Sequence, residues 1–422
     1  MTRHEIARPA PAELPLVAPR SLYVHIPFCV SICPYCDFVV VAGAQTRGPR
    51  NRIAPFVAAL RREIELRANA LDVARGLPGS TRRPPLETLY FGGGTPSELS
   101  SEQLSGLVGL VRDRFGLAAG AEVTLEANPG PDERGDADAL VAAGVNRISF
   151  GAQALDDAQL RRLGRRHRVG DVAAAVAGAR AAGIGSINLD LLYDAPGQST
   201  TTFGTTLEAA LELSPDHLSL YALALDDPDV EGLTGPQGDH LPVTAGARRW
   251  RARARPGQDE DRAAAMYEHA VHRLAAAGFA GYEISNWARP GHESRHNLAY
   301  WERRPVEAVG PGAHAFDGRT RRWNAARLDR YVDALTEVPG HPATLPPGGF
   351  ETLDASTAVA ETVILALRTD RGLPRTAAAE PPLKGHLGWA LAAELLRFDA
   401  ADRIVLTTRG RLLSNELFLR LV

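Results

Sequence analysis

The chain has 422 residues, of which 45% are hydrophobic and 23% charged, and its formal net charge is −3. This length predicts two domains, or one large barrel with an appendage, and the near-neutral charge argues against a strong attraction to nucleic acid or to anionic membranes. Lys384 is the only lysine, so the basic residues are almost all arginine. We interpret this as a bias of composition rather than as an arginine-based binding surface.

The chain shows no apolar stretch long enough to span a bilayer. Residues 1–20 carry charges and prolines where the apolar core of a signal peptide would lie, so we expect a flexible tail and a cytoplasmic protein. Its three cysteines cannot form a closed set of disulfides, and the cytosol would keep them reduced.

From residue 21 onward, short runs of β-branched or aromatic residues alternate with longer helical runs. We predict strands at residues 22–26, 88–91, 122–126, 147–150, 187–192 and 217–221. We predict helices at residues 53–70, 101–115, 137–143, 172–182 and 202–213. Strands that alternate with helices indicate parallel βαβ units. The expected fold is therefore α/β, a partial (β/α)6 barrel of the TIM type.

Barrels of this kind carry their chemistry at the carboxyl ends of the strands. The polar and glycine-rich segments of this chain follow the predicted strands in order. They are the cysteine loop, then GGGTP, EANP, GAQ and DLLYDAPGQ, and finally Tyr221. We therefore expect one site at the mouth of the barrel.

The regular alternation stops after Tyr221. Residues 226–262 are rich in proline, glycine and charge, including RRWRARARPGQDEDR, and we predict an exposed excursion long enough to cover the barrel mouth. A helix is expected at 262–277, and the barrel domain would extend from 21 to 336. Residues 337–350 have the composition of a linker. The remainder, 351–422, is predicted to be a small helix-rich domain with a wing-like β-hairpin around 408–410, followed by a helix.

The cysteines Cys29, Cys33 and Cys36 lie within eight residues of one another. With His25 they offer one nitrogen and three sulfurs, which is a permissible set of zinc ligands. Redox chemistry of a dithiol would leave one cysteine over. The remaining alternative is an iron–sulfur cluster held by three thiolates, with one iron open to a ligand. Spacing alone leaves zinc and the cluster both open.

The pattern Cys-x3-Cys-x2-Cys, with Tyr35 before the last cysteine, resembles the cluster loop of radical S-adenosylmethionine (SAM) enzymes. This resemblance implies a 4Fe-4S cluster on Cys29, Cys33 and Cys36, with SAM bound to the open iron and cleaved by one electron. The glycines of YFGGGTPS would by themselves suggest a flexible turn. They also resemble the SAM-binding glycine motif, which implies that Gly93, Gly94 and Thr95 contact SAM.

Further segments resemble the family that contains the oxygen-independent coproporphyrinogen III oxidases and the haem chaperone HemW. They include LYVHIPFC, LEANP, GVNRISFGAQ, NLDLLYDAPGQ, GYEISNWARPG and SRHNLAYW. The resemblance implies a HemN-like C-terminal domain and further SAM contacts from Tyr23, Tyr35, Glu126, Gln153, Arg165 and Asp190. One departure is YDAPGQ, where relatives more often have YGLPGQ.

Two features separate the chaperones from the oxidases of this family. The oxidases carry another cysteine two residues after the cluster set, where this chain has Phe38, and they have a longer N-terminal segment. The segment HNLAYW resembles the haem-binding motif of the chaperones. It implies that His296 ligates haem iron and that Tyr300 and Trp301 pack on the macrocycle. His292 is a rival ligand, on the same face if the segment is helical.

The resemblance therefore implies a radical SAM protein of porphyrin and haem metabolism. We expect a chaperone that binds a 4Fe-4S cluster, SAM and haem and delivers haem to apoproteins. Its partners would be haem, a haem-accepting apoprotein and a small electron-donor protein, with association at the membrane surface and no nucleic acid. The alternatives are a coproporphyrinogen oxidase that converts two propionates to vinyl groups, and a zinc-stapled binding protein without redox chemistry.

Overall fold

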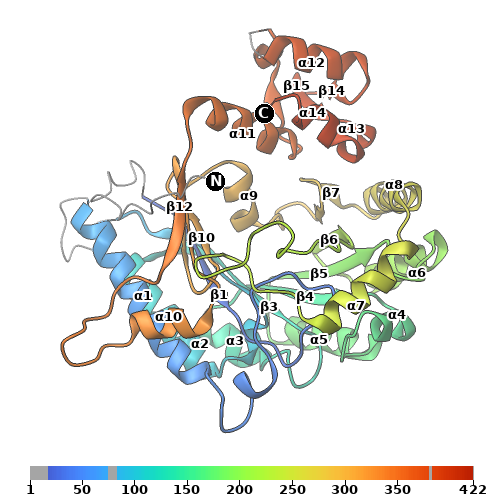
Figure 1. Ribbon diagram of the computed structural model, residues 1–422. Helices are drawn as coiled ribbons and strands as arrows, with labels where there is room; N and C mark the ends of the chain where they lie inside the picture. Colours follow the sequence, from blue (N-terminus) through green and yellow to red (C-terminus); the bar gives the residue numbers. More distant parts are fainter. Residues whose placement is uncertain (1–17, 75–82, 380–382, 422) are drawn as a thin grey trace.

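The computed structural model describes residues 18–74, 83–379 and 383–421 and has a mixed α/β fold (Figure 1). Its main element is a 12-stranded sheet in the order β12-β11-β10-β9-β1-β2-β3-β4-β5-β6-β8-β7. Strands β9, β1, β2, β3, β4, β5 and β6 run parallel to their neighbours, and the outer pairs are antiparallel. The sheet ends in two edge strands, β12 and β7, and forms a partial barrel.

The strands of this sheet are β1 (Ser21–Ile26), β2 (Leu86–Gly93), β3 (Leu117–Ala127), β4 (Arg147–Gln153), β5 (Ser186–Tyr193), β6 (His217–Ala222), β7 (Ala280–Gly281), β8 (Asn286–Ala288), β9 (Val306–Val309), β10 (His314–Phe316), β11 (Thr320–Asn324) and β12 (Gly348–Thr352). The helices packed around it are α1 (Ile53–Ala74), α2 (Ser101–Phe115), α3 (Ala137–Ala143), α4 (Asp157–Arg162), α5 (Val169–Ala181), α6 (Thr200–Glu212), α7 (Ala245–Ala254), α8 (Glu260–Ala276), α9 (Arg295–Trp301) and α10 (Leu328–Leu335). All six predicted strands are confirmed, and the structure extends each by one to six residues.

The two faces of the sheet differ because side chains alternate along each strand. On β1, Leu22, Val24 and Ile26 are fully buried in one apolar core with residues of α1, α2, α3, α5 and α6. Between them, Tyr23 and His25 face the inside of the curved sheet, where their side chains hydrogen-bond to each other. The chain therefore provides an apolar outer face for the helices and a polar inner face for a site.

The C-terminal part of the chain forms a separate small sheet with its own core (Figure 1). It contains α11 (Ala355–Leu367), β13 (Leu373–Pro374), α12 (Leu383–Ala392), β14 (Leu396–Phe398), β15 (Arg403–Leu406), α13 (Thr408–Leu412) and α14 (Ser414–Phe418). The predicted wing-like hairpin is present but lies earlier than expected, because β14 and β15 form it and residues 408–410 lie in α13. Thr407 caps that helix by accepting a hydrogen bond from the Gly410 N–H.

Three segments differ from the expectations for the connecting regions. The glycine-rich end of the predicted linker is strand β12, which pairs with β11, and Gly348 and Gly349 lie so close to Trp323 that neither could carry a side chain. The predicted excursion contains α7, which packs on the barrel. Helix α4 was missed in the sequence. Residues 1–17 of the predicted flexible tail lie outside the described residues.

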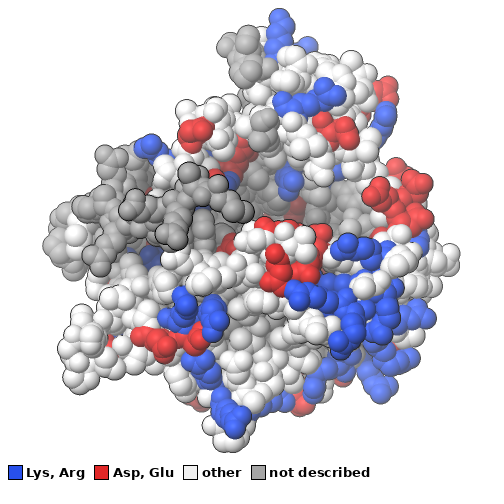
Figure 2. Space-filling model, viewed as in Figure 1, with Lys and Arg blue, Asp and Glu red and all other residues white. Residues whose placement is uncertain are grey.

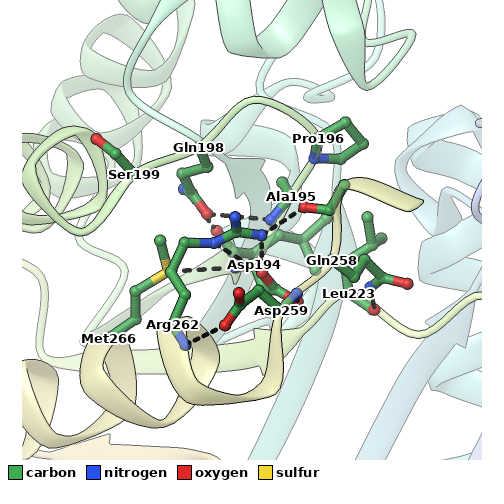
Figure 3. A network of polar contacts seen from close by, with 12 residues as sticks. Asp194, Ala195, Pro196, Gln198, Ser199, Leu223, Gln258, Asp259, Arg262 and Met266 are labelled. Atoms are coloured by element: carbon green, nitrogen blue, oxygen red, sulfur yellow. Dashed lines mark hydrogen bonds and ion pairs between the residues drawn. The ribbon is translucent and has the colours of Figure 1, made fainter. Parts of the chain in front are cut away.

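Asp194 ties the end of β5 to the beginning of α8 (Figure 3). Its buried carboxylate accepts from Arg262 Nε at 3.0 Å and from the Asp259 N–H at 3.3 Å. Its backbone has φ of 53°, in the left-handed region that favours glycine. The departure from YGLPGQ at this position therefore replaces a flexible residue with a charge that anchors the segment carrying α7 and α8.

We expect Asp194→Ala to lower the free energy of unfolding by about 2 kcal/mol, since Arg262 would be left without its carboxylate but remains 26% exposed. Asp194→Gly should cost about 1 kcal/mol less, because glycine adopts this backbone conformation without strain. Urea denaturation of both variants, with Arg262→Ala and the double variants, measures the coupling between the two side chains. Equal losses for the alanine and glycine variants would contradict this account.

Candidate functional site

The loop that carries the three cysteines follows β1 and is tied down by its own backbone. The Cys29 N–H donates to Val41 O at 3.0 Å, and the Val41 N–H donates to Pro27 O at 2.7 Å. The Thr46 hydroxyl donates to Cys29 O at 3.0 Å, and the Cys36 N–H closes a turn onto Cys33 O. The cysteines are therefore held at the carboxyl end of the first strand, as predicted.

Hydrogen-bond donors reach two of the sulfurs. The Thr95 hydroxyl donates to Cys29 Sγ at 3.4 Å, and Arg165 Nη1 donates to Cys33 Sγ at 3.2 Å. Burial raises the pKa of the Cys29 thiol to about 12 and also raises the pKa of Cys36. Because buried thiols resist ionisation, thiolates in this loop would need a nearby positive charge, which a metal centre supplies.

His25 is not directed at the cysteines. Its Nδ1 is hydrogen-bonded to the Tyr23 hydroxyl at 3.1 Å and its Nε2 to Val39 O at 2.8 Å. Burial lowers its pKa to about 4. Within the described residues, no three His, Cys, Asp or Glu side chains are placed to hold one metal ion. Because both ring nitrogens of His25 are already hydrogen-bonded, its geometry argues against a zinc ion that uses His25 together with the cysteines.

The glycines at the end of β2 allow the neighbouring chain to approach closely. A Cβ on Gly94 would lie 2.7 Å from Phe28 O, and one on Gly93 would overlap the His25 ring. The N–H groups of Gly94 and Thr95 donate to Ile26 O at 2.8 Å and Phe28 O at 2.7 Å. The glycine motif is thus fastened to the start of the cysteine loop, and its amides already have partners.

Glu126 at the end of β3 lies beside this motif. Its carboxylate accepts from the Gly93 N–H at 2.8 Å and from the Tyr90 hydroxyl at 2.7 Å. Burial raises its pKa to about 7 despite these two donors. Tyr90 stacks on Tyr23, with ring centroids 6.0 Å apart. The structure therefore joins Tyr23, Gly93 and Glu126 through Tyr90, a residue that the sequence analysis did not single out.

Arg165 reaches the site from the segment after α4. Its Nη2 donates to Asn128 Oδ1 and to Gly151 O at 2.8 Å, while its Nε is buried without a partner among the described residues. Gln153, at the end of β4, has φ of 65°. Arg165 is thus the arginine of its crowded segment that faces the cysteines.

Asp190 lies on the inner face of β5. It accepts from Ser149 Oγ at 3.0 Å and from Asn188 Nδ2 at 2.7 Å, and burial raises its pKa. With Glu126 on β3, it gives the inner face of the sheet two half-buried carboxylates. Both were predicted from the sequence.

Helix α7 covers the outside of the cysteine loop. Arg251 is buried and donates to Pro34 O at 3.1 Å and to Cys36 O at 2.9 Å. The Trp250 ring lies 6.2 Å from the Tyr35 ring. Neither residue was predicted, although the run RRWRARAR was the signal available in the sequence.

Helix α9 carries the segment HNLAYW and places His296 inside the barrel. His296 is 1% exposed, and its Nδ1 is hydrogen-bonded to Thr88 Oγ1 on β2 at 2.8 Å. Its Nε2 meets the Tyr300 hydroxyl at 3.3 Å, and its ring lies 5.0 Å from the Tyr90 ring. Burial lowers its pKa to about 3, so the imidazole is neutral at ordinary pH.

The other residues of this motif lie nearer the surface. Tyr300 is 39% exposed, and Trp301 is half-buried with the Arg368 guanidinium over its ring at 5.9 Å. His292 precedes the helix, which begins after Ser294, so it does not share a helical face with His296. It is half-buried and contacts Ser186 Oγ at 3.1 Å.

Comparison with known proteins places this arrangement in a family. Residues 23–210, which include the cysteine loop and the glycine motif, match the family described as "Radical SAM superfamily". The protein named heme chaperone HemW from Mycobacterium tuberculosis is 41% identical over 97% of this chain and 98% of its own length. The chain belongs to the HemW family. The HemW protein of Escherichia coli is 33% identical over 94% of this chain and 97% of its own length.

The fold of this HemW family member also resembles a solved structure. Coproporphyrinogen III oxidase (HemN) from Escherichia coli, described as a radical SAM enzyme, matches with a TM-score of 0.76 and 25% identity. The match covers 97% of this chain and 91% of HemN. It confirms the radical SAM type of α/β fold. None of the helices in the described ranges is long and apolar enough to cross a membrane.

The buried histidines of this HemW family member predict sensitivity to acid. Burial lowers the pKa of His25 and His167 to about 4, that of His296 to about 3, and that of His217 well below its usual value. Their contribution to stability is complete above pH 6.5 and is lost as the pH falls toward 4, because the unfolded chain then binds more protons. Glu126 acts in the opposite direction, since its raised pKa favours the folded state at low pH.

The four histidines should outweigh Glu126 and the other carboxyls whose pKa burial raises, such as Asp190 and Glu283, so that acid lowers the free energy of unfolding. We expect the free energy of unfolding to fall by about 1 to 2 kcal/mol per histidine between pH 7 and pH 5. Urea denaturation at both pH values measures it, and His167→Gln should remove one histidine's share of the change. An unfolding free energy that stays constant or rises toward pH 5 would refute the prediction.

Proposed function

We propose that this protein is a haem chaperone that binds a 4Fe-4S cluster, SAM and haem and passes haem to an apoprotein. The observation that carries the proposal is the sequence similarity, over nearly the full length of each chain, to proteins named heme chaperone HemW. Phe38 supports it, because a further cysteine would be expected at this position in an oxidase, and the phenylalanine is 64% exposed. We infer a cytoplasmic protein that associates with the membrane surface.

The cluster would be held by Cys29, Cys33 and Cys36. When bound, the cluster and SAM supply one-electron chemistry. Arg165 and Thr95 would stabilise the thiolates through the hydrogen bonds that they already donate to sulfur. The unpartnered Arg165 Nε fits a further anionic group, such as the carboxylate of SAM.

SAM would lie along the inner face of the sheet next to the cysteine loop. Glu126 and Asp190 are carboxylates that can accept hydrogen bonds from its ribose hydroxyls or its amino group. The complete set of proposed contacts is Tyr23, Tyr35, Gly93, Gly94, Thr95, Glu126, Gln153, Arg165 and Asp190. The backbone amides of the glycine motif already have hydrogen-bond partners. The motif would therefore position Glu126 and leave space for SAM.

Haem would bind at α9 through His296, Tyr300 and Trp301. A neutral imidazole is the form that ligates iron, and burial keeps His296 neutral. Tyr300 separates Nε2 from the surface, so binding would require the tyrosine ring to swing away. The freed ring and Trp301 would then pack on the macrocycle.

The test is anaerobic reconstitution followed by haem titration and transfer. Haem should give a Soret shift, and the loaded protein should pass haem to an apocytochrome. A parallel incubation with coproporphyrinogen III, SAM and a reductant examines the alternative oxidase. Formation of protoporphyrinogen IX, or the absence of any Soret shift, would overturn the proposal. The partners, beyond haem, would be the accepting apoprotein and a small electron-donor protein.

A further inference from the structure

Arginines gather on one face of the molecule beside the cysteine loop. Figure 2 shows this positive area over α4 and α7. We call it the arginine face; its exposed members are Arg161, Arg162, Arg166, Arg168, Arg249, Arg253 and Arg255. The whole chain carries a net charge of −3, so this face is a local concentration of positive charge. Arginine richness is therefore more than a bias of composition.

The charge of the arginine face is not neutralised by neighbouring acids. Within the described part of the chain, Arg166 is the one member whose guanidinium lies within 4.0 Å of a carboxylate oxygen, that of Glu133. Arg248, which precedes Arg249, instead pairs with Asp227 at 3.0 Å and with Asp229. Asp227 and Asp229, which precede α7 in sequence, thus pair with Arg248 and leave the exposed arginines of the face to attract an anionic surface.

Only a thin layer separates the arginine face from the cysteine sulfurs. Gly164 lies so close to the loop that a Cβ there would be 2.9 Å from Pro34 Cδ. The next residue, Arg165, donates to Cys33 Sγ at 3.2 Å. On the side of α7, buried Arg251 donates to the carbonyls of Pro34 and Cys36. Both segments that carry the surface arginines therefore also contact the cysteine loop.

Two aromatic rings lie between the arginine face and the loop. The Trp250 indole N–H donates to Arg162 O at 3.1 Å, which fixes the ring between α7 and the end of α4. On its other side it lies 6.2 Å from the ring of Tyr35, which sits between Cys33 and Cys36 in the loop. The face is thus connected to the site by direct packing.

We propose that the arginine face docks the acidic surface of a small one-electron carrier protein that reduces the cluster. This inference rests on the proposed function, since it needs a cluster in the cysteine loop. The carrier loses one electron, the cluster gains it, and no bond forms or breaks. Redox proteins form small and short-lived interfaces, and opposite charges on the two partners speed their association. A surface placed directly over the electron acceptor suits such a carrier better than nucleic acid or a membrane.

The test follows cluster reduction in anaerobic stopped-flow experiments on the reconstituted full-length protein. The probes are a reduced acidic flavodoxin and the methyl viologen radical cation, which is small and positively charged. The test variant is Arg249→Glu/Arg253→Glu. The matched control is Arg319→Glu/Arg397→Glu, which makes the same change of charge at exposed positions on β10–β11 and β14.

At low salt, the flavodoxin rate should fall about tenfold or more in the test variant and stay near wild type in the control. The wild-type rate should fall as salt is added, and methyl viologen should reduce both variants at least as fast as wild type. Equal effects in the two variants, or a salt-independent wild-type rate, would overturn the docking site. The docking site would also be overturned if anionic vesicles or RNA bound to the arginine face while the flavodoxin rate of the test variant stayed unchanged. A protein that methyl viologen cannot reduce would instead refute the proposed cluster.

Discussion

Replacing Cys33 with alanine is expected to abolish assembly of the iron–sulfur cluster and with it the cleavage of SAM. Two thiolates cannot hold a cluster that needs three, and Arg165 Nη1 would lose the sulfur to which it donates. Iron content, the visible absorption of anaerobically reconstituted protein and the yield of cleaved SAM measure the effect. We expect all three to fall to background.

The fold should survive this substitution, because the Cys33 side chain is small and only half-buried. The thermal midpoint of the unreconstituted protein should therefore change by only a few degrees. Ser31→Ala, in the same loop, is the matched control and should keep its iron. A Cys33→Ala protein that binds as much iron as Ser31→Ala, or a wild-type protein that holds a single tetrahedral ion, would disprove the cluster.

The positions of β1 to β6 could be predicted because each is a short apolar run between polar or glycine-rich segments, whereas β9, which pairs in parallel with β1, was missed. The same rule failed at β12, where Gly348 and Gly349 gave the composition of a linker. Glycine is required there because the Trp323 backbone and ring occupy the space of a side chain. Sequence composition does not distinguish a flexible glycine from one that allows two backbones to touch.

Helix α7 escaped prediction for a different reason. Its contacts with the barrel come from Trp250 and from the buried guanidinium of Arg251, which donates to backbone carbonyls of the cysteine loop. A helix held by polar groups shows little apolar periodicity, so the segment resembled a charged excursion. The acceptors for Arg251 lie more than two hundred residues earlier in the chain and could not be identified without the fold.

The residues of the proposed site were largely identified from motifs, but their environments were not. The sequence gives no reason to expect that the Glu126 carboxylate accepts a hydrogen bond from the Gly93 N–H. Nor does it indicate that Tyr90 hydrogen-bonds to Glu126 and packs against the ring of His296. Those contacts depend on the register of β1, β2 and β3, which places alternate residues of neighbouring strands side by side. The register is a property of the folded sheet.

Replacing His296 with alanine is expected to weaken haem binding by about tenfold or more, because the haem iron would lose the nitrogen ligand that we propose for it. The Soret shift on haem titration should shrink accordingly. His292→Ala is the matched control, since it removes a half-buried histidine outside the helix, and it should bind haem like wild type. Because burial lowers the pKa of His296 to about 3, wild-type binding should show no titration near pH 6.5.

Loss of His296 leaves the buried Thr88 hydroxyl without its partner, which costs about 1 to 3 kcal/mol. Tyr300→Phe tests the same idea without that cost, because it removes only the hydroxyl that meets Nε2 at 3.3 Å. With Nε2 released, the phenylalanine variant should bind haem at least as tightly as wild type and at a higher rate. If Tyr300→Phe weakens haem binding as much as His296→Ala does, or if His292→Ala abolishes it, His296 is not the ligand.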